Sequence, residues 1–420
     1  MIGKNNLPGV LDLKAERSFP RFTITAKGTR WTDSGHPWIY EAEVLQGDDA
    51  AENGSLVDAV SVGGKYIGTG FLSRSSKIRI RLVSRNANDR FDAAFWERRI
   101  RYAWEYRKSA MREDISCCRV IFGEADGFPG LTVDRFSEIL VTQTLSAGME
   151  RLKPVIFPLL LKVLREDGQD VRAIYERNDA ALRELEGLPQ GKGWFPTGEP
   201  LPEQTSTEIC ENGITYSVDF ENGQKTGFFL DQKYNRQAVA RLAAGKRVLD
   251  CFTHTGSFAL NAARGGAEHV TALDISASAI GMAQRNAERN GLSGRMDFLV
   301  ADVFDYLTEL EKTGQKPFDF IILDPPAFTK SRKTVANAER GYKEINYRAL
   351  KLLPRGGWFA TCSCSHFMPN ELFVKMLQSA ARDANVQLMQ LEMRQQAPDH
   401  PILWSVPETD YLKFYLFRVV

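Results

Sequence analysis

The sequence predicts an α/β protein in three parts: an N-terminal small β-barrel, a central mixed α/β domain and a C-terminal doubly wound, Rossmann-like sheet. After Ile209, apolar runs of strand length alternate with helical segments. Such alternation is typical of a parallel sheet covered by helices on both faces. Residues 22–83 instead contain short β-branched runs separated by glycines, which favour strands joined by tight turns. Residues 188–204, rich in proline and glycine, mark a boundary between the middle and C-terminal parts.

Length and composition limit the possible functions. A chain of 420 residues, 43% of them hydrophobic, is long enough for two or three domains with cores of their own. No apolar run reaches the about eighteen residues of a membrane span, and the N-terminus lacks the layout of a signal peptide. The six cysteines contain no C-x-x-C pair, which disfavours a zinc clip or a disulfide framework. We therefore expect a cytoplasmic protein without a membrane span or a metal.

The predicted elements follow from the hydrophobic spacing along the chain. The expected divisions are an N-terminal arm (1–20), the barrel (21–91), the central domain (92–205) and the sheet domain (206–420). In the central domain, helices are predicted over residues 93–111 and 149–165 and strands around them. In the sheet domain, strands are predicted over residues 246–252, 269–275, 296–303, 318–326 and 357–365.

The last predicted strand of the barrel carries a row of cations. Lys77, Arg79 and Arg81 alternate with apolar residues, so one face of this strand is apolar and the other is basic. We predict that these cations contact RNA phosphates, with a strong dependence of affinity on salt. The alternative is an edge strand whose charges only prevent edge-to-edge pairing.

Acidic residues close four successive strands of the predicted sheet: Asp250, Asp274, Asp302 and Asp324. Ligands of doubly wound sheets bind beyond the carboxyl ends of the strands. The turn after the first strand has one glycine, Gly256, and not G-x-G-x-x-G, so a dinucleotide cofactor is disfavoured. An acid at the second strand end suits a ribose diol, and the third can accept from an adenine amino group. This pattern fits S-adenosylmethionine, although each acid taken alone could be a helix cap.

Several motifs together resemble one family. They are GEADGFPGLTVDRF, GFFLDQ, DCFTHTGSFAL, DPPAFTKS, RGYKEIN and TCSCS. Over nearly the whole chain the sequence is similar to the bacterial 23S ribosomal RNA cytosine-5 methyltransferases of the large-subunit methyltransferase I family. The resemblance implies a PUA-like RNA-binding domain at the barrel, a methyltransferase domain at the C-terminus, and 23S RNA or a large-subunit particle as partner. Oligomeric state is open, with a homodimer as one option.

The resemblance and the strand ends give one set of expected cofactor-binding residues. These are Phe229, Asp231, Asp250, Phe252, Thr253, Gly256, Ser257, Phe258, Asp274, Asp302, Asp324 and Pro325. Asp231 could otherwise cap the helix that follows it. The chain departs from the family pattern at His254, where an aromatic such as Tyr is more familiar, and at Cys362, where an apolar residue is usual. Both departures leave room for another target base.

Two cysteines at the end of the last predicted parallel strand indicate the chemistry. Methylation of cytosine at carbon 5 requires a thiolate that adds to carbon 6. Cys364 lies further along the strand than Cys362 and is the predicted nucleophile, whereas Cys362 is predicted to be packing. Asp324 would hold the edge of the base, and Pro325 fixes the backbone just past it.

Three residues of the following loop have two readings each. Phe328 could stack on the base or plug the end of the sheet, and Lys330 and Arg332 could contact phosphates or be solvated. Two other functions stay open. DPPAF also suits methylation of a guanine or adenine nitrogen, and a non-catalytic RNA-binding assembly factor is a third option that the retained acids disfavour.

Overall fold

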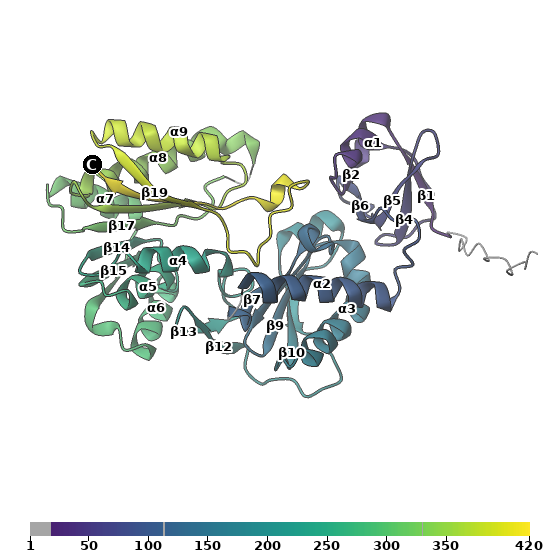
Figure 1. Ribbon diagram of the computed structural model, residues 1–420, viewed down its shortest axis with the longest axis horizontal. Coiled ribbons are helices and arrows are strands. Elements are labelled where there is room, and N and C mark those ends of the chain that lie inside the picture. Colours follow the sequence, from purple (N-terminus) through teal and green to yellow (C-terminus); the bar gives the residue numbers. More distant parts are fainter. Residues whose placement is uncertain (1–17, 112–113, 330) are drawn as a thin grey trace, which may run out of the picture.

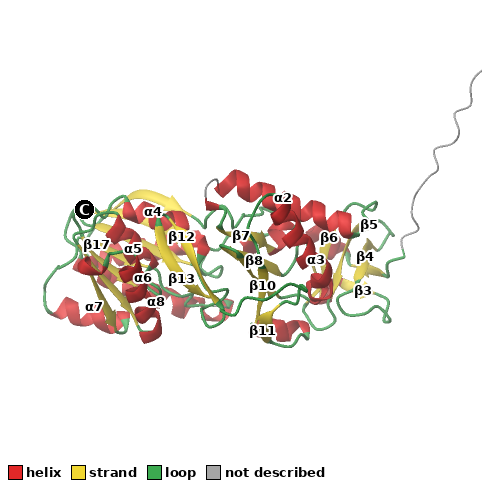
Figure 2. Cartoon of the chain, turned by 90° about the horizontal axis from the view of Figure 1, so that it is seen from below, coloured by secondary structure: helices red, strands yellow, loops and turns green. Residues whose placement is uncertain are grey.

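In the computed structural model, residues 18–111, 114–329 and 331–420 are described, and the side chain of Arg332 is also excluded. The molecule is elongated, with the N-terminal sheet at one end, the central sheet in the middle and the C-terminal sheet at the other end (Figures 1 and 2). Among the described residues, no helix is both long and apolar enough to cross a membrane.

The N-terminal part is a six-stranded sheet with one helix, α1 (Ala26–Asp33). In the order β2-β6-β5-β4-β1-β3, its strands are β2 (Trp38–Tyr40), β6 (Ile78–Ser84), β5 (Tyr66–Leu72), β4 (Leu56–Ser61), β1 (Arg21–Ile24) and β3 (Val44–Gln46). The strands predicted here are confirmed, but the first one ends at Ile24. It ends there because the Thr25 hydroxyl caps α1, accepting a hydrogen bond from the Gly28 N–H at 2.9 Å.

The central part is a five-stranded sheet with two long helices, α2 (Ala93–Met111) and α3 (Ala147–Glu166). In the order β11-β10-β9-β8-β7, its strands are β11 (Gly191–Trp194), β10 (Ala173–Asn178), β9 (Ile139–Thr144), β8 (Leu131–Phe136) and β7 (Cys117–Phe122). α2 has the predicted bounds. α3 begins two residues before its predicted start because Ser146 caps it by accepting from the Met149 N–H.

A hairpin joins the central part to the C-terminal sheet. It consists of β12 (Ser206–Glu211) and β13 (Ile214–Asp219). Side chains of the hairpin, such as Tyr216, share one buried cluster with Tyr175 of the central sheet and Val248 of the C-terminal sheet. The two parts therefore share a continuous core, and the divisions at residues 91 and 205 stay predictions.

The C-terminal sheet has seven strands in the order β16-β15-β14-β17-β18-β20-β19. They are β14 (Arg247–Cys251), β15 (His269–Asp274), β16 (Met296–Val300), β17 (Phe320–Leu323), β18 (Trp358–Ser363), β19 (Leu388–Arg394) and β20 (Lys413–Val419). The helices are α4 (Lys233–Ala240), α5 (Ser257–Arg264), α6 (Ala277–Arg289), α7 (Val303–Lys312), α8 (Val335–Leu352) and α9 (Asn370–Asp383). The five predicted strands are confirmed and pair in parallel, whereas β20 runs antiparallel to both β18 and β19.

The connection between β19 and β20, residues 395–412, leaves the sheet and reaches the N-terminal part (Figure 1, yellow). We call it the C-terminal arm. Its Glu408 carboxylate lies 3.2 Å from Nε2 of His36, which precedes β2. The arm therefore connects the two ends of the molecule, which no local pattern of the sequence predicts.

Candidate active site

Two of the predicted acids lie where the order of the C-terminal strands reverses. The chain runs outward from β14 through β15 to β16, and then returns to β17 on the other side of β14. Asp250 is the fourth residue of β14, and Asp324 directly follows β17. Because β14 and β17 pair in parallel, both carboxyl groups lie at the same edge of the sheet, where ligands of such folds bind.

The Asp250 carboxylate is buried and only half satisfied. Its Oδ2 accepts hydrogen bonds from the Thr253 hydroxyl at 2.6 Å and from the Ala259 N–H at 2.9 Å. Its Oδ1 has no hydrogen-bond partner among the described residues. Burial raises the pKa of Asp250 to about 7, and the nearby charges of Asp324 and Asp274 act in the same direction. A cationic ligand would relieve this cost.

Asp324 has a similar environment. The side-chain amide of Gln232 donates to its Oδ1 at 3.1 Å. Burial raises the pKa of Asp324 to about 6, the Asp231 carboxylate adds to this rise, and the Arg236 guanidinium opposes it. Several carboxyl groups therefore lie close enough for their negative charges to repel each other.

The turn after β14 has an unusual backbone. Phe252 and His254 both have positive φ angles, 63° and 50°, which cost free energy in non-glycine residues. Gly256 has a φ of 81°, and a Cβ on it would lie 2.9 Å from the Cβ of Ala283. A glycine is thus required at Gly256, because α6 approaches too closely for any side chain. The strained turn fixes the backbone beside Asp250.

The next two acids are held by backbone N–H groups. Asp274 accepts from His254 at Oδ2 and from Ser276 at Oδ1, both at 2.9 Å. Asp302 is the N-cap of α7, with Oδ1 accepting from Phe304 at 2.8 Å. The alternative that Asp302 caps a helix is therefore confirmed, and the cap uses one of its two carboxylate oxygens. Each carboxylate keeps acceptor capacity for a ligand, since an ionised carboxylate has about four lone-pair sites.

The segment before α4 brings Phe229 and Asp231 to the same edge of the sheet. The Phe229 ring meets the His254 ring edge to face at 5.3 Å. The Tyr411 hydroxyl donates to Oδ2 of Asp231 at 2.7 Å, whereas Oδ1 is buried and has no hydrogen-bond partner among the described residues. Burial alone would raise the pKa of Asp231, but the charges of His400 and Lys225 hold it below its ordinary value.

The alternative that Asp231 caps the following helix is wrong. The N-cap of α4 is Gln232, and its side chain makes no capping hydrogen bond.

The two cysteines of TCSCS have different environments. Cys362 lies inside β18, opposite Phe414, and is fully buried. Cys364 is the first residue after β18 and is partly exposed, with its Sγ 4.0 Å from the carbonyl oxygen of Pro325. Burial raises the pKa of the Cys364 thiol to about 11, as does the Asp324 charge, while Lys225 and Lys413 lower it. Only Cys364 of this pair combines exposure with proximity to the Asp-Pro-Pro segment.

Comparison with known proteins assigns this arrangement to a family. Residues 188–418 match the family of S-adenosylmethionine-dependent methyltransferases, and residues 22–85 match a PUA-like domain. Ribosomal RNA large subunit methyltransferase I of Klebsiella pneumoniae (strain 342) is 39% identical, with 96% of this chain and 99% of the relative covered. The protein of the same name from Aeromonas salmonicida (strain A449) is 41% identical over 91% of this chain and 95% of the relative.

The chain belongs to the ribosomal RNA large subunit methyltransferase I family of S-adenosylmethionine-dependent methyltransferases. Solved structures agree on the fold. A candidate S-adenosylmethionine-dependent methyltransferase from Streptococcus mutans superimposes with a TM-score of 0.78 at 22% identity, covering 95% of this chain and 99% of that one. A candidate methyltransferase solved in complex with SAH has a TM-score of 0.80 at 21% identity and the same coverage.

The polar groups of this methyltransferase suit the charge of S-adenosylmethionine. The cofactor carries a sulfonium and an ammonium group, and the site offers the unpartnered Oδ1 atoms of Asp231 and Asp250. No group of three or more metal-ligating side chains is present among the described residues.

Cofactor affinity should depend on pH through Asp250. With a pKa of about 7 in the free enzyme, this carboxyl is neutral below pH 7 and must ionise to attract a cation. We expect affinity for S-adenosylmethionine to rise between pH 6 and pH 8 and then to level off. The gain is about tenfold for each pKa unit by which the bound cofactor lowers the pKa of Asp250. Calorimetric titration at several pH values measures this, and Asp250→Asn should flatten the profile. An equally steep profile in that variant would assign the titration to another group.

Some predicted residues play a packing role in the structure. Phe258 is buried, with its ring stacked on Phe414 at 6.3 Å, so its side chain belongs to the core. Phe328 packs against Tyr342 at 4.6 Å and also contacts Phe252 and Phe304, which agrees with the plug reading. Lys330 and the side chain of Arg332 lie outside the described residues.

The predicted row of cations on β6 is not a free basic face. Arg79 forms an ion pair with Glu41, and Arg81 is buried in an ion pair with Glu186 at 2.8 Å. Lys77 is exposed. The predicted alternation of an apolar and an exposed basic face is wrong at Arg81, which is buried, and acids from distant segments pair with two of the three cations.

Three residues of the site were missed by sequence reasoning. Gln232 follows Asp231 in the GFFLDQ motif, and this position was a local signal that could have identified it. Tyr411 and Lys413 come from the C-terminal arm and the start of β20, far from the motifs in sequence. Lys413 is buried, and its Nζ donates to the carbonyl oxygens of Ser365 at 2.6 Å and Tyr411 at 2.8 Å.

Proposed function

We propose that this protein transfers a methyl group from S-adenosylmethionine to carbon 5 of a cytosine in large-subunit ribosomal RNA, with Cys364 as the nucleophile. The observation that carries the proposal is the partly exposed Cys364 thiol beside the Asp324-Pro325 segment. The names of the relatives support ribosomal RNA as the substrate class. A homodimer and a cytoplasmic location stay predictions.

The cofactor would be held by residues at the carboxyl ends of β14, β15, β16 and β17 and by Asp231, just before α4. Asp274 would accept hydrogen bonds from the ribose hydroxyls, and Asp302 from the adenine amino group. Asp231 and Asp250 would face the positive charges of the amino-acid part. When bound, the cofactor supplies a methyl group on a sulfonium sulfur, which is open to attack by a carbon nucleophile.

The role of Cys364 is to make carbon 5 of cytosine a nucleophile. Its thiolate would add to carbon 6, forming a carbon–sulfur bond, and the π electrons of the 5,6 double bond would shift into a 4,5 double bond, which places the charge on N3. Carbon 5 would then form a bond to the methyl group, and the electron pair of the broken sulfur–methyl bond would stay on sulfur, leaving S-adenosylhomocysteine. Loss of the proton from carbon 5 to a base restores the double bond and expels the Cys364 thiolate, which returns the enzyme to its starting state.

The neighbours of Cys364 divide the remaining tasks. Asp324, with a pKa of about 6, would accept from the amino group or share a proton with N3 of the base, which stabilises charge on the ring during addition. Lys225 and Lys413 lower the pKa of the Cys364 thiol and so favour its thiolate. The charges of these two lysines offset part of the rise in the Cys364 pKa that burial causes.

Product analysis tests the proposal. Ribosomal RNA from cells that lack the protein would be incubated with the purified enzyme and S-adenosylmethionine, digested to nucleosides and analysed by mass spectrometry. We expect 5-methylcytidine to appear. A methyl group on a guanine or adenine nitrogen would favour the nitrogen chemistry that the Asp-Pro-Pro-Ala-Phe segment also suits. RNA binding without any methylated product would favour an assembly factor.

A further inference from the structure

We infer that Trp404, at the outer end of the C-terminal arm, is a stacking platform for an unpaired nucleobase of the RNA substrate. The inference rests on the proposed RNA substrate and adds to it a specific contact outside the catalytic residues. It concerns how the RNA is held beside the active site, and it does not depend on which atom of the base is methylated.

The exposure of Trp404 is exceptional in this chain. Its side chain is 95% exposed, whereas the next most exposed tryptophan, Trp31, is 39% exposed. Among the described residues, Trp404 has no ring contact or side-chain hydrogen bond. An indole in this position contributes nothing to the core, and a large exposed aromatic is typical of a binding surface.

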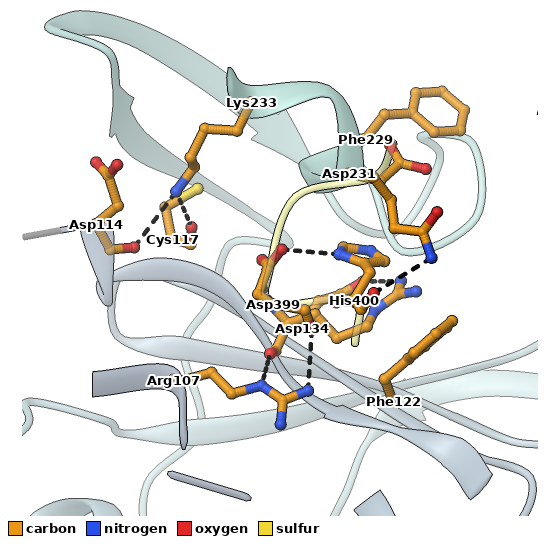
Figure 3. A network of polar contacts seen from close by, with 12 residues as sticks. Arg107, Asp114, Cys117, Phe122, Asp134, Phe229, Asp231, Lys233, Asp399 and His400 are labelled. Atoms are coloured by element: carbon orange, nitrogen blue, oxygen red, sulfur yellow. Dashed lines mark hydrogen bonds and ion pairs between the residues drawn. The ribbon is translucent and has the colours of Figure 1, made fainter. Parts of the chain in front are cut away.

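Hydrogen bonds hold the backbone of the arm that carries Trp404. Arg107, which is fully buried, donates to the Asp399 carbonyl oxygen at 2.9 Å, and the Ala397 N–H donates to the Asp231 carbonyl oxygen at 2.7 Å. Figure 3 shows Asp399 and His400 between Arg107 and Asp231. Closer to the tryptophan, the Leu403 N–H donates to the Thr409 hydroxyl at 2.9 Å. Because the backbone is held, only the side-chain torsions of Trp404 need to be ordered when a base stacks on it.

The surface next to Trp404 has the charge that RNA requires. A Cβ on Gly35 would lie 2.8 Å from the Cβ of Ser405, so the arm touches the N-terminal part just after α1. The exposed residues of α1 include Lys27, Arg30 and Trp31, and no ion pair engages either cation among the described residues. Cations interleaved with exposed aromatics are the features that bind single-stranded nucleic acid. This surface replaces the β6 row, whose arginines are paired.

The position of the arm connects this surface to the catalytic residues. Tyr411 of the arm bonds Asp231, and Glu408 of the arm pairs with His36. His36 in turn stacks on Trp31 with ring centroids 4.6 Å apart. His366, two residues after Cys364, is close enough to add to the lowering of the Glu408 pKa, which the hydrogen bond from His36 dominates. An RNA strand that crosses the arm would therefore pass from α1 toward Cys364.

Binding measurements on the full-length protein test the inference. The probes are a labelled single-stranded RNA of about 16 nucleotides and a duplex of the same length. Fluorescence anisotropy of the label measures the affinity of the protein for each probe. We expect Trp404→Ala to weaken single-strand binding by about 5- to 100-fold, the range for loss of one stacked base. Trp404→Phe should retain most of the affinity, and duplex binding should change less. Tyr102→Ala, which removes another aromatic that is 65% exposed, is the matched control.

Salt dependence separates stacking from charge. Trp404→Ala should leave the slope of log affinity against log salt unchanged, whereas Lys27→Gln with Arg30→Gln should reduce it by about 0.7 per lost phosphate contact. Wild-type affinity in Trp404→Ala would overturn this inference and leave the proposed methylation intact. Failure of the wild type to bind either RNA would overturn both. Equal losses for single strand and duplex would show that Trp404 does not act by stacking.

Discussion

Replacing Cys364 by alanine will abolish methyl transfer and covalent capture of RNA that carries 5-fluorocytosine at the target position, and Cys362→Ala will preserve both. Fluorine at carbon 5 blocks the final loss of the proton, so the enzyme that adds to carbon 6 stays bound to its RNA. Denaturing electrophoresis of the enzyme with labelled RNA measures the adduct. The expected difference is complete because Cys362, although its thiol contacts Asp324, is fully buried, whereas Cys364 is partly exposed and open to a base.

The structure explains why two cysteines so close in sequence should differ. Cys362 is packed inside β18 and burial raises its pKa well above the ordinary value, so its thiolate is scarce. Cys364 has a pKa of about 11 in the free enzyme, which burial and Asp324 raise and which Lys225 and Lys413 oppose. Lys225→Met, which removes the first of these cations, should therefore slow alkylation of Cys364 by iodoacetamide and move its pH profile to higher pH.

The outcome that would contradict the carbon-5 mechanism is equally clear. An adduct that survives in Cys364→Ala, or methyl transfer that proceeds without this thiol, would favour methylation of a nitrogen. Thermal unfolding of both alanine variants serves as the control for folding. If Cys362→Ala does not fold, Cys364→Ser is compared with the wild type instead. Serine keeps nearly the size of the cysteine side chain and removes only the thiol.

Asp274→Ala will remove most of the affinity for S-adenosylmethionine. Two hydrogen bonds from the ribose to a charged acceptor would be lost, at roughly 1.5–3 kcal/mol each. Asp274 already accepts from His254 and Ser276, so the backbone holds its carboxylate in place for the ligand. Isothermal titration calorimetry with S-adenosylmethionine and with SAH measures the change.

Two control variants separate binding from folding at Asp274. Asp297→Ala removes an exposed acid of β16 that pairs with His269, and should leave the dissociation constant unchanged. Thr25→Ala, which removes the cap of α1 far from the site, should reduce stability by about 1 kcal/mol and leave the dissociation constant unchanged. If Asp274→Ala lowers the unfolding temperature but binds the cofactor like the wild type, the carboxylate only tethers its loop.

The sequence by itself determined the layered architecture and the location of the site. β14, β15, β17 and β18 are mostly apolar on both faces, a local property that requires burial and therefore predicts a parallel sheet. The acids that end these strands must meet at one edge because parallel strands share their direction. Cys364 was separated from Cys362 by its position along the strand, and the structure gives the two side chains the different exposure expected from it.

Only the tertiary structure decided which charges are free and which distant residues complete the site. Arg79 and Arg81 look like an RNA-binding row until the fold brings Glu41 and Glu186 against them. Tyr411 reaches Asp231 only because β20 runs antiparallel between β18 and β19, which sends the C-terminal arm across the molecule. Periodicity reports which side of an element is buried, but ion pairs between remote segments depend on how the elements pack. Their partners are therefore fixed by the assembled fold and not by local sequence.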